Sequence, residues 1–158
     1  MTKKMTEQLR TLPYFQNEKY AMIIIKMEEE RTKKSVDYWL ETAADDLVTV
    51  EALFQLKRYV GTLFWGHLLL EKILKAHVVK ITKAEAPYTH DLLRLAKLAK
   101  LDLSKEDEDL LDAVNRFNIR ARYPDYKLAI HKEATAKYTR KYVVKIKVLY
   151  ENLCQKIK

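Results

Sequence analysis

Three arginines and a tyrosine lie within one short stretch of the chain: Arg116, Arg120, Arg122 and Tyr123. On a helix, Arg116 and Arg120 lie one turn apart on the same face, whereas Arg122 projects elsewhere until the helix ends. Because a guanidinium group binds phosphate oxygens in a bidentate manner, these residues predict a nucleotide or phosphate site. Tyr123 is expected to stack or hydrogen bond at the same site.

The alternative to phosphate binding is that these arginines pair with carboxylates of the same chain. The acids considered are Asp112, Asp125 and Asp46. Asp46 falls within a helical stretch nearer the N-terminus, where a carboxylate can hold an arginine in place. We expect an orienting role for Asp46 and Asp125, and the sequence leaves both interpretations open.

A second group of basic residues lies near the C-terminus. Residues 131–158 carry a net charge of +6, whereas residues 35–130 are nearly neutral. On a helix, three lysines spaced four residues apart would form a row on one face: Lys137, Lys141 and Lys145. Arg140 widens this row, and tyrosines flank it. Such a stripe suits the phosphates and bases of an anionic partner such as RNA. The alternative is a solvated helix face opposite the core.

The histidines and the single cysteine predict neither a metal site nor a nucleophile. His67 and Glu71 have a spacing that can hold a metal, but no third ligand is evident, which favours a histidine in the core or at an interface. His90 follows Thr89 in a loop and has no partner that suggests catalysis. Cys154 has no nearby base to lower its pKa. We expect no metal ion and no cofactor.

These residues must be positioned by helices, because the composition excludes most other frameworks. The 158 residues include two glycines and three prolines, against average usages of roughly 7% and 5%. Phosphate loops, dinucleotide-binding turns and tight hairpins depend on glycine. One cysteine excludes a disulfide framework and a four-thiolate zinc site. The sequence therefore predicts a single all-α domain.

Periodic apolar residues predict five helices, over about residues 35–57, 62–81, 89–99, 104–123 and 131–155. We expect N-caps at Ser35, Thr89 and Ser104. Pro124 disfavours helix at the preceding residue, so the fourth helix is expected to end there. The second helix is apolar nearly all round in its first half, as is typical at the centre of a bundle or at a subunit interface.

The first 34 residues fit this pattern less well. They are predicted to be an appendage of uncertain structure, with short helices over 1–10 and 19–33 and a break at 11–13, before a domain of residues 35–158. They are equally consistent with sequence upstream of a natural start at Met27. No apolar run approaches the roughly 18–20 residues that span a bilayer. We expect a cytoplasmic protein without a membrane segment.

Five fragments, in this order, resemble the HEPN family (higher eukaryotes and prokaryotes nucleotide-binding). They occupy roughly Val36 to Leu153 and end in segments similar to the family's THDL and ARYPD signatures. The fragments are Trp39 with Ala43 and Asp46-Leu47, Phe64-x-x-His67, Glu71–Ala76, Tyr88–Leu92 and Ala121–Asp125.

This resemblance implies an antiparallel four- or five-helix up-and-down bundle that forms a homodimer. Trp65, Leu69 and Ile73 are candidates for the surface that a second copy covers. Such domains are often paired with a minimal nucleotidyltransferase in toxin–antitoxin systems. The resemblance therefore predicts a protein that binds a nucleotide or RNA and works with a nucleotidyltransferase.

The sequence departs from the family's ribonuclease members, in which a histidine follows an arginine after four to six residues. Arg116 can take the cation role and is the one candidate catalytic residue, but positions 121–123 hold Ala, Arg and Tyr. An arginine is a poor general base. A binding module is therefore favoured over an enzyme. The alternatives are a metal-independent endoribonuclease toxin that has lost its histidine, and a helical scaffold that binds nothing.

Overall fold

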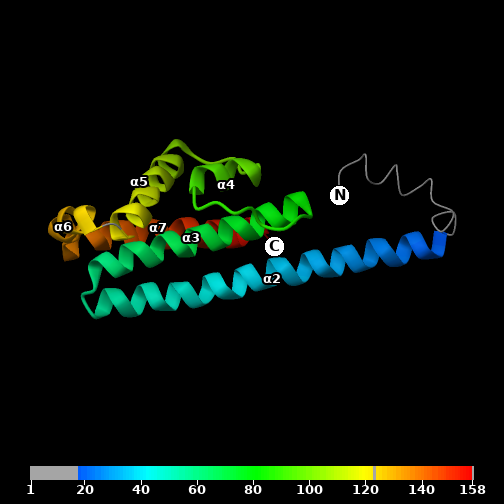
Figure 1. Ribbon diagram of the computed structural model, residues 1–158, viewed down its shortest axis with the longest axis horizontal. Helices are drawn as coiled ribbons and strands as arrows, with labels where there is room; N and C mark the ends of the chain where they lie inside the picture. The colour runs from blue at the N-terminus through cyan, green and yellow to red at the C-terminus, as the bar shows by residue number, and fades with distance from the viewer. Residues whose placement is uncertain (1–17, 123, 158) are drawn as a thin grey trace.

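The computed structural model describes residues 18–122 and 124–157, and every regular element in this part of the chain is an α-helix (Figure 1). The all-α prediction is confirmed, but these residues form six helices instead of four or five. Their bounds are α2 (Glu18–Gln55), α3 (Tyr59–Thr82), α4 (Leu92–Leu98), α5 (Lys105–Arg122), α6 (Pro124–Glu133) and α7 (Ala136–Ile157).

The first helix is longer than predicted. It runs from Glu18 without a break, so the predicted N-cap at Ser35 is wrong, while the helix predicted over 19–33 is confirmed as part of α2. A potential capping residue does not start a helix when the residues before it are themselves good helix formers. The exposed pair Glu30–Lys34, 2.9 Å apart, supports this stretch. Residues 1–17, including the helix predicted over 1–10, lie outside the described residues.

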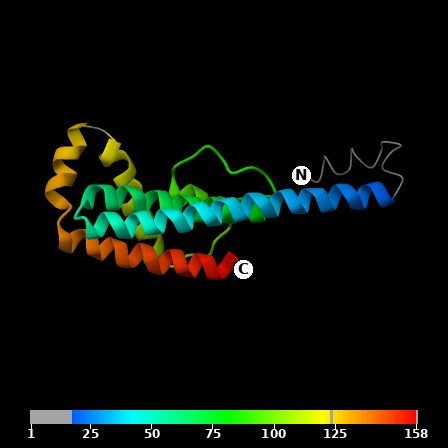
Figure 2. The same ribbon diagram turned by 90° about the horizontal axis from the view of Figure 1, so that it is seen from below.

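Helix α3 is the centre of the fold, because α2, α4, α5, α6 and α7 all contact it. Figures 1 and 2 show α2 and α7 running alongside it on different sides. Five of its apolar residues are fully buried: Leu63, Leu69, Leu70, Ile73 and Leu74. The prediction of a central helix is confirmed. Leu69 and Ile73 are covered by the chain itself, so they are not the partner surface that the sequence suggested.

Two contacts fix α7 against α3. A Cβ atom added to Gly66 would lie 2.8 Å from Ile146 Cδ1, so the glycine lets the two helices approach closely. Farther along, the ring of His77 is buried and its Nε2 lies 2.9 Å from the Leu153 carbonyl oxygen. Burial lowers the pKa of His77, although the hydrogen bond opposes this change. The imidazole of His77 is therefore a neutral core residue.

Side-chain caps define where the shorter helices begin. Asp91 caps α4, because its Oδ1 accepts from the backbone N–H groups of Leu93 and Arg94 at 3.0 and 3.2 Å. The predicted cap at Thr89 is therefore wrong by two residues. Ser104 caps α5 as predicted, and its Oγ accepts from the Asp107 N–H at 3.1 Å.

The C-terminal region contains one helix more than the sequence indicated. A proline is well suited to the first position of a helix, and α6 begins at Pro124. The last helix begins at Ala136 rather than His131, because Thr135 accepts the Tyr138 N–H on its hydroxyl and so caps α7. Thr135 lies in register with the apolar residues of this helix, so its spacing in the sequence is that of a core residue and does not indicate a cap.

No helix in residues 18–122 or 124–157 is both long enough and apolar enough to cross a bilayer.

Candidate functional site

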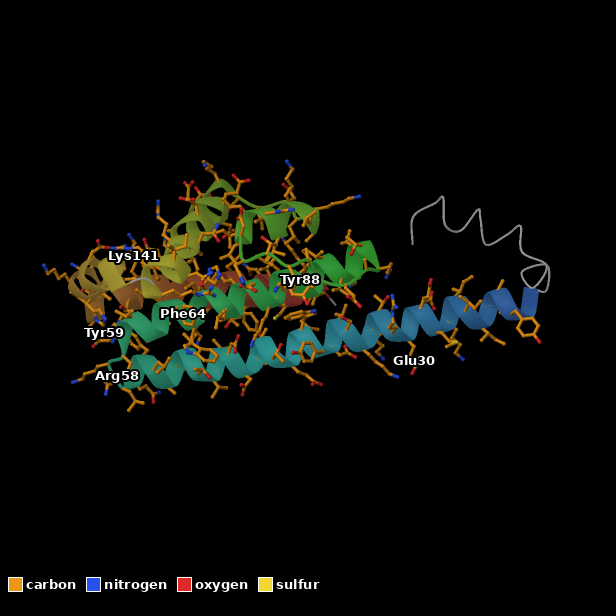
Figure 3. The ribbon with its side chains drawn as sticks, viewed as in Figure 1. Glu30, Arg58, Tyr59, Phe64, Tyr88 and Lys141 are labelled. Atoms are coloured by element: carbon orange, nitrogen blue, oxygen red, sulfur yellow. The ribbon has the colours of Figure 1, made fainter. Side chains whose placement is uncertain are left out.

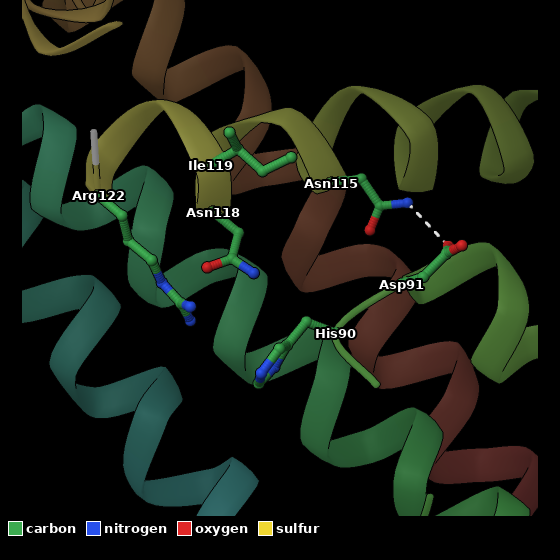
Figure 4. Close-up of a pocket in the computed structure, with 6 residues that line it drawn as sticks. All are labelled: His90, Asp91, Asn115, Asn118, Ile119 and Arg122. Atoms are coloured by element: carbon green, nitrogen blue, oxygen red, sulfur yellow. Dashed lines mark hydrogen bonds between the residues drawn. The ribbon is translucent and has the colours of Figure 1, made fainter. Parts of the chain in front are cut away.

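A cavity of about 390 Å³ lies between the segment that enters α4 and the C-terminal half of α5. Figure 4 shows the side chains of Arg122, Asn118 and His90 converging on it. The full lining consists of His90, Asp91, Asn115, Asn118, Ile119 and Arg122.

Helical spacing explains the α5 wall of this cavity. The lining residues on α5 follow Asn115 at intervals of three, four and seven residues, which places them on one helix face. Asn115 also fixes the opposite wall: its Oδ1 accepts from the Leu92 N–H at 2.9 Å, and its Nδ2 donates to Asp91 at 3.1 Å. The two walls are therefore tied together by one amide side chain.

Asn118 brings an unsatisfied polar group to the cavity. The residue is 6% exposed, and its Oδ1 has no hydrogen-bond partner among the described residues. A buried acceptor without a donor costs about 1–3 kcal/mol. A ligand that supplies an N–H or O–H donor at this point would recover that free energy.

The three predicted arginines have different surroundings. Arg120 donates twice to Glu133, at 2.7 and 2.8 Å, and this hydrogen bonding raises its pKa. Arg116 lies 3.3 Å from Asp112 in an exposed pair. Arg122 lines the cavity, stacks over the Phe64 ring at 5.9 Å, and has no acidic partner within ion-pair distance among the described residues.

The predicted cluster is therefore divided among three environments. One arginine remains open to a ligand in the cavity, and the other two meet carboxylates. Asp112, the partner of Arg116, was among the acids considered from the sequence, whereas Glu133, the partner of Arg120, was not. Tyr123 and the side chain of Asp125 lie outside the described residues.

Beneath the cavity, His90 contacts a buried carboxylate that sequence reasoning did not associate with it. The His90 Nδ1 atom lies 3.0 Å from Glu71 Oε2 on α3, and Glu71 is 5% exposed. The other Glu71 oxygen accepts from Lys75 at 2.8 Å, and His67 Nε2 lies 3.3 Å from Oε2. The expectation that His90 lacks such a partner is wrong.

These contacts determine the charge of the carboxylate. Burial raises the pKa of Glu71, but its contacts with His67, Lys75 and His90 outweigh burial and bring that pKa to about 2. Glu71 is therefore ionised at neutral pH and can only accept hydrogen bonds. Sequence spacing could place His67 and Lys75 beside Glu71, but not His90, which is 19 residues away in a loop.

Asp46 has a related position on α2. It is 1% exposed, and its two oxygens lie 2.8 and 2.7 Å from Lys72 Nζ on α3. Burial raises the pKa of Asp46, and the lysine lowers it by a smaller amount. The residue that Asp46 orients is thus a lysine of the central helix, not an arginine.

The basic row on α7 is exposed. Two of its members contact aromatic rings: Arg140 lies 5.1 Å from the Phe54 ring centroid and Lys141 lies 5.9 Å from that of Tyr142. The flanking tyrosines, Tyr138 and Tyr142, are half-buried and pack against Phe117, and Tyr142 also meets Lys141 of the row. No acidic partner of the row is found within the described ranges, and its members are Lys137, Arg140, Lys141 and Lys145.

Over the described ranges, no group of three or more His, Cys, Asp or Glu side chains is arranged to hold a metal ion.

A family model of the HEPN domain matches residues 36–153. The chain belongs to the HEPN domain family. This HEPN domain also has the fold of TT1696 from Thermus thermophilus, whose crystal structure aligns with a TM-score of 0.65 and 20% identity. That alignment covers 77% of this chain and 98% of the other. The chain has no match among curated proteins.

The family assignment confirms the resemblance inferred from the sequence fragments. The matched residues of the HEPN domain include every residue that lines the cavity, together with Glu71. They begin partway along α2, so the N-terminal half of that helix precedes the match.

Proposed function

We propose that this HEPN domain binds a nucleotide or RNA through a phosphate group seated in the cavity beside α5. The observation that supports this most directly is the pairing of Arg122, which lacks an acidic partner among the described residues, with the unsatisfied Oδ1 of Asn118 at one cavity. A guanidinium group binds phosphate oxygens, and a side-chain amide can form hydrogen bonds with the edge of a nucleotide base. The volume falls within the range of small-ligand sites.

The proposal revises the roles expected for the other arginines. Both terminal nitrogens of Arg120 donate to the Glu133 carboxylate, and this pair joins α5 to α6. Arg116 is exposed and paired with Asp112, away from the cavity lining. Tyr123 directly follows Arg122 in the chain, and for this reason we still expect it to stack on the ligand or form a hydrogen bond with it.

A binding assay with a matched control tests this site. Adenosine monophosphate and a single-stranded oligoribonucleotide are titrated into the protein while melting temperature and fluorescence anisotropy are followed. We expect Arg122→Ala to abolish the response and Arg116→Ala, a change to an exposed arginine outside the cavity, to leave it intact. Equal loss in both variants, or no response in the unaltered protein, contradicts the proposal. The second outcome leaves the scaffold interpretation.

The exposed row on α7 supports a second candidate surface for an RNA backbone. If RNA follows this row, Lys141→Glu weakens binding of the oligoribonucleotide and lowers its salt dependence, while binding of adenosine monophosphate is unchanged. If the row is only a solvated face, the substitution changes neither.

We also propose that the domain forms a homodimer and works with a nucleotidyltransferase in a toxin–antitoxin pair. Family membership supports both statements. Sedimentation at micromolar concentration that shows only an 18.7 kDa species contradicts the dimer. A neighbouring reading frame with a Gly-Ser motif and paired aspartates, whose product co-purifies with this chain, supports the partnership.

A further inference from the structure

The face of α2 that packs on α3 follows a regular pattern, in which residues recur at alternating intervals of three and four positions. Ala43, Asp46 and Val50 on this face are buried in the bundle. Thr32, farther toward the N-terminus in the same pattern, is buried beside Val79 near the end of α3. Helix α3 therefore covers this face of α2 as far as Thr32.

Before Thr32 the same face of α2 continues without a neighbouring helix. The next three positions of the pattern are Glu29, Ile25 and Met22, and these residues line one hollow of the surface. Ile25 is 55% exposed and Met22 is 70% exposed. Figures 1 and 2 show this end of α2 projecting past α3, and no helix of the described residues lies alongside it. Met22, Ile25 and Glu29 are termed the N-terminal seam below.

The other sides of this stretch of α2 are apolar as well. Tyr20, Ile23 and Met27 are exposed and lie outside the seam. A helix that is apolar nearly all round is normally buried, and a group of exposed large apolar side chains marks a protein–protein contact. These residues precede the matched residues 36–153, so the feature belongs to this chain and not to the matched domain.

The charges beside the seam favour one orientation for a second copy of this chain. Glu28, Glu29 and Glu30 follow the apolar residues directly and are exposed. In a parallel pair of helices the two acidic runs would face each other and repel. In an antiparallel pair the runs lie at opposite ends, while Met22 of each copy meets Ile25 of the other in two equivalent layers. Such a pairing is self-complementary about a twofold axis.

We infer that the N-terminal seam is a dimer interface, at which the α2 helices of two copies of this chain pair antiparallel about a twofold axis between residues 23 and 24. The second copy covers the face of α2 that α3 covers farther along the helix. This inference rests on the proposed homodimer and names its surface. That surface is separate from the cavity beside α5.

Sedimentation velocity of the full chain at micromolar concentrations tests the association. We expect a species with twice the 18.7 kDa mass of the chain. Ile25→Asp puts a charge into both apolar layers and should raise the dissociation constant of the dimer more than about tenfold. Val48→Asp is the matched control, because Val48 is a 64% exposed residue of α2 outside the seam, and this variant should dimerise normally. Circular dichroism checks that both variants are folded.

The possible results separate the inference from the proposed homodimer. A dimer that Ile25→Asp does not weaken overturns the inference alone, because the copies then associate through another surface. Equal weakening by Val48→Asp also overturns it, since the added charge and not the seam would be the cause. A monomeric unaltered protein overturns both proposals. If Ile25→Asp then lowers the melting temperature of that monomer, the chain itself covers the seam.

Nitroxide labels at position 33 measure the orientation of the pair. Lys33 is exposed, so Lys33→Cys combined with Cys154→Ser carries one label in each copy. In the antiparallel pair the two labelled positions are about 19 residues apart along the helix axis, which is about 28 Å at 1.5 Å per residue. In a parallel pair they are separated by the interaxial distance of about 8–10 Å. Spectral broadening at that short distance overturns the antiparallel interface.

Discussion

Two carboxylates are buried against the central helix, and their pKa values shift in opposite directions. Glu71 contacts two histidines and a lysine, and its pKa falls to about 2. Asp46 meets Lys72, and burial raises its pKa. Both side chains are almost fully removed from water. The difference shows that the number of donors around a carboxylate, more than the depth of its burial, determines how strongly the fold favours its charge.

This comparison also separates two uses of buried charge. The Glu71 cluster extends from α3 to a cavity through a side chain that solvent can reach, so its charge can act on a ligand. The Asp46 pair joins α2 to α3 and lies outside the cavity lining. Substitutions at the two carboxylates should therefore differ in size and in pH dependence.

The largest expected effect is that of Glu71→Gln on stability. The substitution leaves Lys75 buried without its anion, and removing one partner of a buried pair costs about 3–5 kcal/mol. Urea unfolding followed by circular dichroism measures the change in the free energy of unfolding. Glu30→Gln, in an exposed pair on α2, is the matched control. A similar loss in both variants would contradict the argument from burial.

Next in size is the acid dependence of stability. The pKa of Glu71 is about 2 in the folded chain against an ordinary value of 4.5, so its contribution is present above pH 4.5 and is lost as the pH falls toward 2. At about 1.4 kcal/mol per pKa unit, this amounts to about 3 kcal/mol. Urea titrations between pH 6 and 2 should show this loss in the unaltered protein but not in Glu71→Gln. An unchanged slope in the variant would assign the acid loss to other groups.

A smaller effect is expected for Asp46→Asn. The raised pKa of Asp46 means that folding favours its protonated form, so its titration adds no stability at neutral pH. The asparagine oxygen can still accept from Lys72, which is 26% exposed and reaches water. We expect a loss of about 1 kcal/mol, and the loss of stability toward low pH that comes from Glu71 should still be seen in this variant. A loss as large as that of Glu71→Gln would abolish the contrast between the two sites.

The smallest effect is expected for Glu30→Gln itself. Its hydrogen bond with Lys34 lowers the pKa of Glu30, but both side chains are exposed and water screens the pair. Thermal unfolding should show no change outside experimental error. A clear destabilisation would mean that another part of the chain covers this end of α2.

The sequence predicted those features that depend on neighbouring residues. The all-α class, the central position of α3, the Ser104 cap and the family were all evident from spacing and motifs. The predicted helix starts were wrong where one residue carries two local signals that indicate different structures. Ser35 resembles a cap, but continuous helix formers precede it, and Thr135 has the spacing of a core residue but caps α7.

The candidate site was predicted less well, because it depends on contacts between distant residues. Nothing in the spacing of the three arginines shows that Glu133 occupies Arg120 while Arg122 remains at a cavity. Likewise, the pairing of His90 with Glu71 requires the loop before α4 to fold back on α3. The one local signal was the presence of both residues in the fragments that resemble the family.

The N-terminal part of α2 has a consequence for dynamics. At 1.5 Å per residue α2 is about 57 Å long and α3 about 36 Å. Among the α2 side chains whose burial is described, the first buried one belongs to Thr32. Figure 3 shows Glu30 on the portion that projects past its neighbours. An isolated helical segment is marginal in water, and its backbone amides open without unfolding the core. In the free monomer, amide hydrogens before Thr32 should therefore exchange with deuterium in the earliest time points, while those of α3 remain protected.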